Sequence, residues 1–574
     1  MTRLDTQLEP AAARHDYPWL RRYPPGIDWH RKFTPEPLYA LLDRAVGQHG
    51  SRPCTNFLGK TLTYGDIGGL VARAAAGLQR LGVKKGSRVG LFLPNSPTFI
   101  VYYFAILKAG GTVVNYNPLY TQDELAYQIK DSGTELMVTL DLKILFEKVE
   151  ALLAAGALER TLVCSFAGLL PAAKSVLFKL LKGKDLAHPA RSAMAAKVVL
   201  ESDVLANDGS YDKPTIDPVN DVAVLQYTGG TTGTPKGAML THANVGINAL
   251  QSTACAPQLE DAAERMLGVL PFFHVFAMTV VMNFSIAKAA EIVILPRFVL
   301  VDVLKLIDTC KPTCMPGVPT MFNAIMNHNK LASYDLSSLK FCLSGGAPLP
   351  LEIKTGFERL TGCKLVEGYG LSEASPVVTC NPIDGPVKEG SIGQPVPQTV
   401  ISLRSLADPA QEAAPGEKGE ICVAGPQVMK GYWNKPDETA NQFVGSFLRT
   451  GDVAVMDEEG FFKIVDRIKD LIICSGYNVY PGVVEKAIYS HPAVEEVTVI
   501  GIPDSYRGEA PKAFVKLKAG MSATREDIMR HLDGKLNKIE MPAEIEFRDQ
   551  LPKTMIGKLS KKELRAEEAQ RRRA

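Results

Sequence analysis

The chain has 574 residues, too many for one ordinary hydrophobic core, so we expect a large multi-lobed body with an appended smaller domain. Hydrophobic residues make up 46% of the chain and charged residues 22%, the composition of a soluble globular protein. The formal net charge of only +2 argues against a nucleic-acid partner.

Cysteine usage and the first residues bear on the cellular compartment. The ten cysteines are scattered, and the closest pair, Cys310 and Cys314, has no second Cys or His pair nearby to complete a zinc site. Charged residues interrupt the first 16 positions, where a secretory signal needs an unbroken apolar stretch. We therefore expect reduced thiols and a cytoplasmic location.

Helix and strand patterns alternate from Thr63 onward. Thr63 and Asp66 form a capping-box pattern before an Ala-rich helix that Gly82 ends. Residues 88–93 then have the pattern of a strand, and residues 96–109 that of a helix. Repeated strand–helix units predict mostly parallel sheets that are covered on both faces.

The segment LLPAAKSVLFKLLKGK, residues 169–184, places four lysines among Leu and Phe. A basic amphipathic segment of this kind can lie on an anionic membrane surface. One interpretation is therefore a peripheral association with the inner face of the cytoplasmic membrane. The alternative is an ordinary surface helix with solvated lysines.

An apolar strand pattern at residues 222–225 leads directly into YTGGTTGTPKG, residues 227–237. Glycines let backbone N–H groups turn toward an anion, hydroxyls add donors, and a lysine adds a positive charge. The spacing is not that of the P-loop of kinases and GTPases, and a flexible surface turn is the alternative. The candidate phosphate-binding residues are Thr228, Gly229, Gly230, Thr231, Thr232, Gly233 and Lys236.

Residues 266–287 are free of charge and long enough on paper to cross a bilayer. Pro271, His274, Asn283 and Ser285 interrupt the run, so the sequence favours a buried segment that lines an internal cavity. Beyond about Asp470 the elements become shorter, with strand patterns in VEEVTVIGI and KAFVKL and a capped helix at residues 524–537. This part predicts a small α+β domain, and DRIKD, residues 466–470, is its expected joint.

Together these segments resemble the adenylate-forming superfamily, which contains acyl-CoA synthetases, luciferases and peptide-synthetase adenylation domains. The matching blocks in order are loop 227–237, PFFHVFA (271–277), SGGAPLP (344–350), EGYGLSE (367–373), GSIGQPVP (390–397), GEICVAGPQVMKGYW (419–433), LRTGD (448–452), FFKIVDRIKDLIICSGYNVYP (461–481) and LPKTMIGKLSKKELR (551–565). The resemblance implies an α/β fold with two parts. Residues 1–468 would form a large domain of mostly parallel sheets covered by helices, and residues 469–574 a small mobile α+β domain.

The resemblance also implies a site for ATP and AMP. Besides the loop, the nucleotide-binding residues would be Gly345, Gly346, Ala347, Glu367, Gly368, Tyr369, Gly370, Ser372, Asp452, Arg467 and Lys558. Tyr369 would stack on adenine, while Asp452 and Arg467 would contact the ribose. Thr228 and Glu373 would hold Mg²⁺, which takes few protein ligands.

Three further roles come from the same resemblance. Lys558 would be the catalytic cation, acting with Glu373 and His274, because charge gathers at the α-phosphate when a carboxylate attacks it. The alternative is that Lys558 belongs to a basic, solvated tail. Lys469 would be the hinge of the small domain, and the face toward coenzyme A would carry Ser475, Gly476 and Tyr477.

The acyl pocket would lie around His274, Phe276 and Met278. The apolar run from Met266, and the absence of an obvious charge to meet an amino group, favour a long alkyl chain over an amino acid. VNYNPLY (114–120) and AVMDEEGFFKIVDR (454–467) resemble bacterial long-chain fatty acid CoA ligases. The expected reaction converts a fatty acid, ATP and coenzyme A into acyl-CoA through an acyl-adenylate. Alternatives are an aryl-CoA ligase of the coumarate type, a medium-chain acyl-CoA synthetase, a fatty acyl-AMP ligase that stops before CoA, and a noncatalytic nucleotide-binding membrane scaffold; a homodimer is left open.

Overall fold

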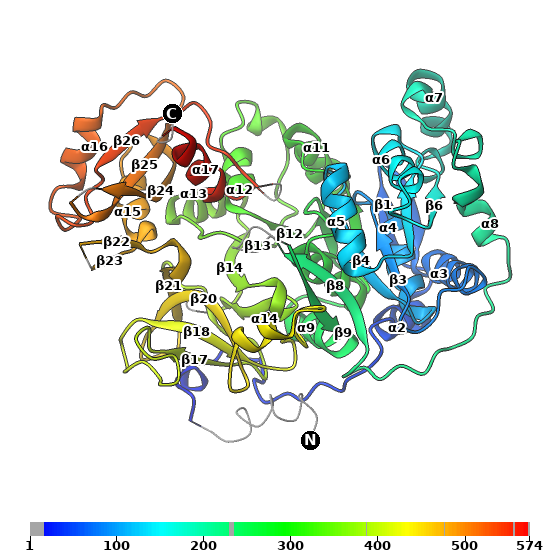
Figure 1. Ribbon diagram of the computed structural model, residues 1–574, viewed down its shortest axis with the longest axis horizontal. Helices are drawn as coiled ribbons and strands as arrows, with labels where there is room; N and C mark the ends of the chain where they lie inside the picture. The colour runs from blue at the N-terminus through cyan, green and yellow to red at the C-terminus, as the bar shows by residue number, and fades with distance from the viewer. Residues whose placement is uncertain are drawn as a thin grey trace. The chain divides into compact units, whose positions relative to one another are not determined.

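The computed structural model describes residues 16–228, 235–385, 387–475, 477–504, 506–554 and 557–571 (Figure 1). Its contacts group the chain into two units. Unit 1 comprises Met1–Glu389, Gly393–Val400 and Ala424–Ser446, and unit 2 comprises Gly390–Ile392, Ile401–Val423 and Phe447–Ala574. The expected hinge at Lys469, which would divide mobile domains of residues 1–468 and 469–574, stays a prediction.

One sheet of unit 1 has the strand order β7-β6-β5-β3-β4-β8-β9. The strands are β3 (Arg88–Leu91), β4 (Thr112–Asn115), β5 (Leu136–Leu140), β6 (Arg160–Cys164), β7 (Val198–Leu200), β8 (Val222–Thr228) and β9 (Lys236–Thr241). Neighbouring strands run parallel except β8 and β9. Helix α4 (Pro97–Lys108) packs on β3 and β4, and α6 (Lys143–Ala154) packs on β5 and β6 (Figure 1).

The second sheet of unit 1 has the order β16-β15-β14-β13-β12-β10-β11-β1-β2. The strands are β1 (Pro53–Phe57), β2 (Lys60–Thr63), β10 (Arg265–Gly268), β11 (Glu291–Ile294), β12 (Cys314–Gly317), β13 (Phe341–Ser344), β14 (Lys364–Gly370), β15 (Val377–Cys380) and β16 (Gln394–Pro395). The segment from β1 through β11, β10, β12 and β13 to β14 is parallel. The expectation of mostly parallel sheets is therefore confirmed.

The other helices of unit 1 are α2 (Ala40–His49), α3 (Tyr64–Arg80), α5 (Gln122–Ser132), α7 (Ala172–Lys182), α8 (Glu201–Leu205), α9 (His242–Ala254), α10 (Phe284–Ala287), α11 (Leu300–Cys310), α12 (Pro319–Met326), α13 (Leu351–Thr361) and α14 (Pro436–Asn441). The capping box at Thr63 and Asp66 is present, with each partner's side chain bonded to the other's backbone N–H. The helix start that Thr63 and Asp66 predicted is therefore confirmed. The capping box stabilises this start because it satisfies N–H groups that the first turn leaves unpaired.

The apolar run at residues 266–287 belongs to the interior of unit 1. It forms β10, a turn, a buried π-helical segment, Ala277–Asn283, and α10. The expectation of a buried segment is confirmed. Among the described residues, no helix combines the length and the hydrophobicity that crossing a membrane requires.

In unit 2, β17 (Val400–Arg404), β18 (Gly419–Ala424), β20 (Phe447–Met456) and β21 (Phe462–Arg467) follow one another in one sheet. The other elements are β22 (Ile472–Cys474), β23 (Tyr477–Val479), α15 (Pro481–Tyr489), β24 (Val494–Asp504), β25 (Gly508–Leu517), α16 (Arg525–Leu532), β26 (Glu544–Phe547) and α17 (Lys561–Arg571). The expected helix at residues 524–537 was too long, because Asp533 has extended backbone and Gly534 a positive φ.

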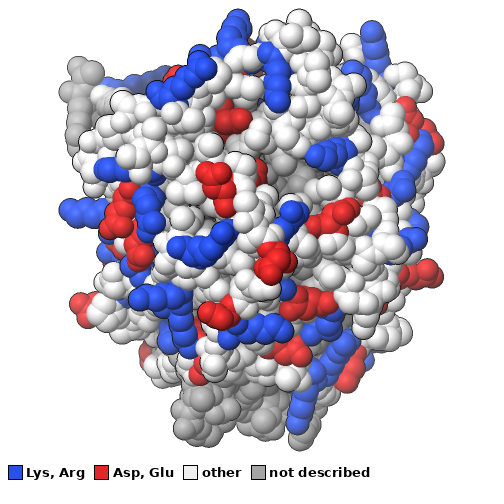
Figure 2. Space-filling view, turned by 90° about the vertical axis from the view of Figure 1, so that its right-hand side faces the viewer, with Lys and Arg blue, Asp and Glu red and all other residues white. Residues whose placement is uncertain are grey.

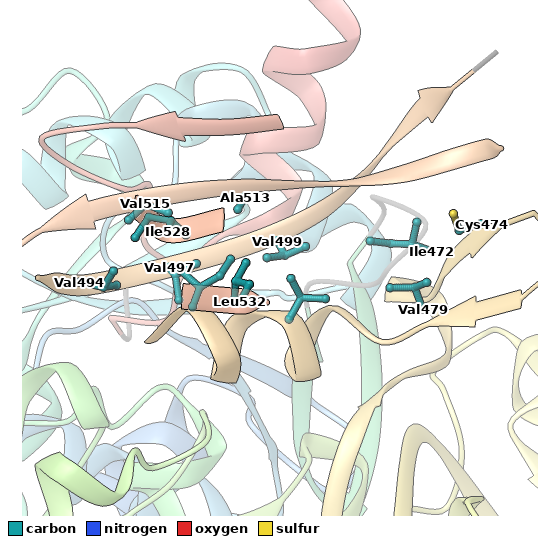
Figure 3. Packing of buried hydrophobic residues seen from close by; sticks show 12 residues of the cluster. Ile472, Cys474, Val479, Val494, Val497, Val499, Ala513, Val515, Ile528 and Leu532 are labelled. Carbon is teal, nitrogen blue, oxygen red and sulfur yellow. The ribbon is translucent and has the colours of Figure 1, made fainter. Parts of the chain in front are cut away.

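The long hairpin of β24 and β25 has two apolar faces. One face, with Val497 and Val499, packs in the core that Figure 3 shows, together with Ile528 and Leu532 of α16. The opposite face belongs to a second core, whose residues are Ile500, Ile502, Phe514, Leu551 and Leu564, with Leu559 packed against it. Successive side chains of a strand point to opposite faces, so one hairpin supports both cores.

Candidate active site

The expected nucleotide segments follow neighbouring parallel strands of the second sheet. Ser344, the last residue of β13, pairs with Gly317 of β12 and with Glu367 of β14. Residues 345–347 and 367–373 therefore lie at the same carboxyl edge, where open α/β sheets bind ligands. Strand β10 runs parallel to β12 and leads into residues 271–278, so the expected acyl segment begins at this edge too.

Close packing joins the acyl segment to the nucleotide segments. A Cβ atom at Gly345 would lie 3.0 Å from the Phe276 ring, so the absence of a side chain lets this ring approach the backbone. At Gly370 a Cβ atom would lie 2.1 Å from the carbonyl oxygen of Pro376, which no larger residue could tolerate. The hydroxyl of Thr279 donates to the Ser375 carbonyl at 2.6 Å.

The two sheets of unit 1 are connected at this edge through amide side chains. Asn115, at the end of β4, donates to Gln226 of β8 at 3.0 Å and approaches the Met278 sulfur at 3.5 Å. Gln226 in turn donates to the carbonyl of Phe273 at 3.0 Å. Met278 is fully buried, whereas His274 is part-buried and accepts from the backbone N–H of Phe276 at 3.2 Å. The role of His274, Phe276 and Met278 in an acyl pocket stays a prediction.

The expected phosphate loop connects β8 to β9, two strands that are paired antiparallel with Thr228 opposite Lys236. The loop's two ends are thereby held together at the edge of the first sheet. Five candidate residues lie outside the described residues: Gly229, Gly230, Thr231, Thr232 and Gly233.

A chain of polar contacts links Lys236 to Glu373. The Lys236 ammonium pairs with Glu438 and lies 5.2 Å from the centre of the Tyr432 ring. The Tyr432 hydroxyl donates to Glu373 Oε1 at 2.8 Å. Burial, and then the negative charge of Glu373, raise the pKa of Tyr432, so the phenol stays protonated and continues to donate. Tyr432 thus connects the expected phosphate lysine to the expected metal carboxylate.

Sequence reasoning assigned no role to Tyr432, although it lies in the GEICVAGPQVMKGYW block. The backbone around it is fixed on β9: the Met239 N–H donates to Gly431 O at 2.8 Å, and the Trp433 N–H donates to Gly237 O at 2.8 Å. A tyrosine directly after a glycine in a matched block was the available signal. Its partner is 59 residues away in the chain, and no local pattern reveals such a pairing.

Glu367 and Tyr369 belong to β14. Burial raises the pKa of Glu367 to about 8, against the opposing effect of a hydrogen bond from the Leu349 N–H at 3.3 Å. Glu367 is therefore mostly protonated at neutral pH. The Tyr369 side chain is buried, while Gly370 beside it is exposed. Gly346 has a φ of +79°. A Cβ atom at Gly368 would lie 3.2 Å from the Leu343 side chain. Ala347 and Ser372 are at this carboxyl edge as well.

Glu373 and Thr228 are the described candidates for Mg²⁺. The Tyr432 hydrogen bond orients the Glu373 carboxylate, which has further lone pairs for a cation. Within the described ranges, no group of three or more His, Cys, Asp or Glu side chains is arranged to hold a metal ion. An oxygen set of one carboxylate and one hydroxyl fits Mg²⁺, because this ion keeps waters and uses substrate phosphates as ligands.

In unit 2 the expected ribose contacts form an ion pair. Asp452 of β20 lies opposite Arg467 of β21 in the antiparallel register, and Arg467 Nε lies 2.8 Å from Asp452 Oδ1. The Asp452 side chain is buried, whereas Arg467 is half exposed. Nearby, Glu420 orders the preceding turn by accepting from the Gly451 N–H at 3.0 Å. The carboxylate therefore sits in a fixed place with a cation beside it.

Lys558 belongs to the same unit. The Thr554 N–H donates to the Lys558 carbonyl at 2.6 Å, and the next residue, Leu559, packs on the second core. Burial lowers the pKa of Lys558 to about 8; the charges of Arg467 and Lys469 also lower it, and Asp452 opposes them. Lys558 is part-buried, whereas Lys562 is exposed.

Lys469 lies in a short 3-10 helix, Ile468–Asp470, directly after β21. Burial and then the Arg467 charge lower the pKa of Lys469. Ser475 has a φ of +52° in the turn between β22 and β23, and Tyr477 is exposed. Gly476, the third residue of the expected coenzyme A face, lies outside the described residues.

Comparison with known proteins gives consistent results. The family model described as AMP-binding enzyme matches residues 42–433, and that of the AMP-binding enzyme C-terminal domain matches residues 483–558. A long-chain-fatty-acid CoA ligase of Bacillus subtilis (strain 168) is 45% identical over 565 residues, covering 96% of this chain and 98% of the relative. One from Escherichia coli O157:H7 is 38% identical over 560 residues, covering 96% and 98%. Among solved structures, ATP-bound MatB from Rhodopseudomonas palustris has a TM-score of 0.79 at 28% identity, covering 92% of this chain and 98% of that one.

Proposed function

Because this chain belongs to the AMP-binding enzyme family, we propose that it is an ATP-dependent CoA ligase for long-chain fatty acids. It first forms an acyl-adenylate and releases pyrophosphate, and then transfers the acyl group to coenzyme A with release of AMP. The observation that carries the proposal is the contact of Phe276 with Gly345, which joins an apolar, buried segment to the nucleotide segment. The long-chain-fatty-acid CoA ligases that it resembles over 96% of its length support the acid class.

In the proposed first step, unit 1 binds and orients the substrates. Backbone N–H groups of the phosphate loop and the Lys236 ammonium hold the ATP phosphates, and Tyr369 contacts adenine. Glu373 and Thr228 would hold Mg²⁺, which would neutralise charge on the phosphates. Tyr432 keeps the Glu373 carboxylate oriented, and His274 and Phe276 border the acid at the start of its pocket. Exclusion of water from this apolar edge favours attack by the carboxylate over hydrolysis.

In the proposal, unit 2 carries the side chains that change position between the two steps. Asp452 and Arg467 bind the ribose hydroxyls, and Lys558 stabilises the charge that gathers at the α-phosphate as the carboxylate attacks. After pyrophosphate leaves, rotation about Lys469 withdraws Lys558 and brings the face of Ser475 and Tyr477 to the thiol. The hinge separates two reactions at different atoms: adenylation, in which the carboxylate attacks the α-phosphorus, and thioester formation, in which the thiol attacks the acyl carbon. A homodimer stays a prediction without a described contact to support it.

An acid-dependent pyrophosphate-release assay tests the proposal. The purified protein is given ATP, Mg²⁺ and saturated acids of increasing chain length or a cinnamate-type acid, with and without coenzyme A. We expect the highest kcat/KM for long-chain acids, with acyl-CoA formed only when coenzyme A is present. A higher kcat/KM for the aromatic acid would mean that the enzyme is an aryl-CoA ligase and not a fatty acid CoA ligase. Absence of pyrophosphate release with every acid would reject the ligase itself.

A further inference from the structure

Helix α7 presents an apolar face that the described part of the protein does not cover. None of its eleven residues, AAKSVLFKLLK, is buried. The exposed fractions are 59% for Val176, 54% for Leu177, 77% for Leu180 and 68% for Leu181. Leaving four neighbouring aliphatic side chains in water is unfavourable, and contiguous exposed apolar surface marks interaction sites.

The four side chains share one side of the helix. Leu177, Leu180 and Leu181 follow Val176 by one, four and five residues, so the four side chains form a stripe along one face of the helix. Phe178 lies on the opposite side, where its ring centre is 5.1 Å from that of Phe166. Phe178 therefore fixes the rotation of α7, and the aliphatic stripe points away from the body of unit 1.

Positive charge borders the stripe. Lys174 and Lys179 flank it on its two sides by helical spacing, Lys182 ends the helix, and no acidic residue occurs from residue 169 to residue 184. Lys174 also donates to the Leu58 carbonyl at 2.7 Å, which ties that edge of the helix to the fold. In Figure 1, α7 stands at the upper right, at the end of its unit. The face turned toward the viewer in Figure 2 shows lysine and arginine side chains along its upper edge, with uncharged surface between them.

We infer that α7 docks the protein on the surface of an anionic lipid bilayer, with Val176, Leu177, Leu180 and Leu181 inserted among the acyl chains and the flanking lysines on the headgroups. Amphipathic helices with this arrangement lie in the plane of the interface, buried by about 5–10 Å. Lysine stems reach along the apolar surface while their ammonium groups stay at the headgroup level. The docking stands on α7 alone; only its benefit, access to acids dissolved in the bilayer, rests on the proposed function.

Charge and area favour lipid over a second copy of the chain. An 11-residue helix is roughly 16 Å long and about 10 Å wide, so its outer face is far smaller than the about 800 Å² that each partner of a standard protein interface buries. Two copies meeting through this face would also bring their lysines together. A bilayer needs no matching shape, and its phosphates complement the lysines.

The test measures binding to vesicles without ATP, acid or coenzyme A, so that failure of docking and failure of the ligase reaction are separate results. The full-length protein is sedimented with vesicles of phosphatidylcholine, with or without phosphatidylglycerol, at low and high salt. We expect sedimentation with the phosphatidylglycerol vesicles, weaker at high salt, and little with phosphatidylcholine alone. Protein that stays in the supernatant with both vesicle types overturns the inference.

Two double variants localise the contact. L180S/L181S should lower vesicle binding at least tenfold without changing the melting temperature, because both side chains are already in water. L351S/L360S, on α13, replaces two other exposed leucines and should bind as the wild type does. K179E/K182E should weaken binding and remove its salt dependence. Unchanged binding of L180S/L181S overturns the inference, and so does a concentration-dependent dimer in gel filtration that this variant abolishes.

Discussion

The carboxyl edge in unit 1 and the charged cluster in unit 2 hold their ionisable groups in opposite ways. In unit 1, Lys236 has a carboxylate partner and Glu373 has a phenol donor, so each charge is met by a group of the protein. In unit 2, Lys558 is surrounded by two cations and one carboxylate, and its pKa is lowered. A region with excess positive charge and restricted access to water is stabilised by a negative ligand. The first region is organised without a ligand, whereas we expect the second to be completed by an anionic substrate.

The largest effect should come from removing the unbalanced cation. Lys558→Ala should lower the adenylation rate by about 10²–10³-fold, because a preorganised charge at the reacting phosphate is lost. ATP–pyrophosphate exchange measures this step. Thioester formation from preformed acyl-adenylate should be retained, as should both steps in the control Lys562→Ala. Equal loss of both half-reactions in Lys558→Ala would mean that the lysine has a structural role.

A second variant tests whether unit 2 must move. Lys469→Pro fixes φ at the proposed hinge, so it should leave adenylation near the wild-type rate and slow thioester formation by roughly 100-fold, since a poorly placed reacting group costs about that much. Lys469→Ala, which removes the ammonium but not the backbone freedom, should retain both steps. If Lys469→Pro forms acyl-CoA from acyl-adenylate at the normal rate, the hinge lies elsewhere.

In unit 1, Tyr432→Phe removes the hydroxyl that orients Glu373 and leaves the ring beneath Lys236. We expect an affinity for Mg²⁺ about tenfold weaker, seen as a higher Mg²⁺ concentration for half-maximal pyrophosphate release, with kcat recovered at saturating Mg²⁺. Tyr334→Phe, elsewhere in unit 1, provides the matched control. A kcat that stays low at saturating Mg²⁺ would assign Tyr432 a role beyond orientation of the carboxylate.

The smallest effect concerns pH. In the proposed mechanism the cationic form of Lys558 assists adenylation, and its pKa of about 8 means that this form is half lost near pH 8. The kcat/KM of adenylation should therefore fall as pH rises through 8, and above pH 8 the decrease should approach tenfold for each pH unit. Lys469→Ala removes a charge that lowers this pKa, so it should move the decline to higher pH. A flat profile to pH 9.5 in both proteins would contradict the assignment.

Local patterns in the sequence predicted much of this architecture. Thr63 with Asp66 started a helix as expected, and the alternation of apolar runs with helical periods gave parallel sheets, because these signals depend on neighbours a few residues away. The segment at residues 169–184 was correctly recognised as amphipathic. The exposure of its aliphatic side chains could not be known, since burial depends on which distant element covers a face.

Contacts between residues far apart in the chain could not be predicted from the sequence. Asp452 and Arg467 were each identified through motif resemblance, but their direct ion pair depends on the register of β20 and β21. Tyr432 and the Glu438 partner of Lys236 were missed because each pairing closes a long segment of chain. The end of the helix after Leu532 was misplaced by five residues, since Gly534 with positive φ follows an otherwise helical pattern.

The second core of unit 2 has a consequence for chain shortening. Leu551, Leu559 and Leu564 lie on either side of Lys558 in the sequence and pack with Ile500, Ile502 and Phe514. A stop codon placed before residue 551 would therefore strip an aliphatic layer from a sheet as well as delete an ammonium group. Such a product should aggregate or be degraded, so the dead phenotype of a nonsense allele there would reflect lost protein rather than lost chemistry, and only point substitutions separate the two.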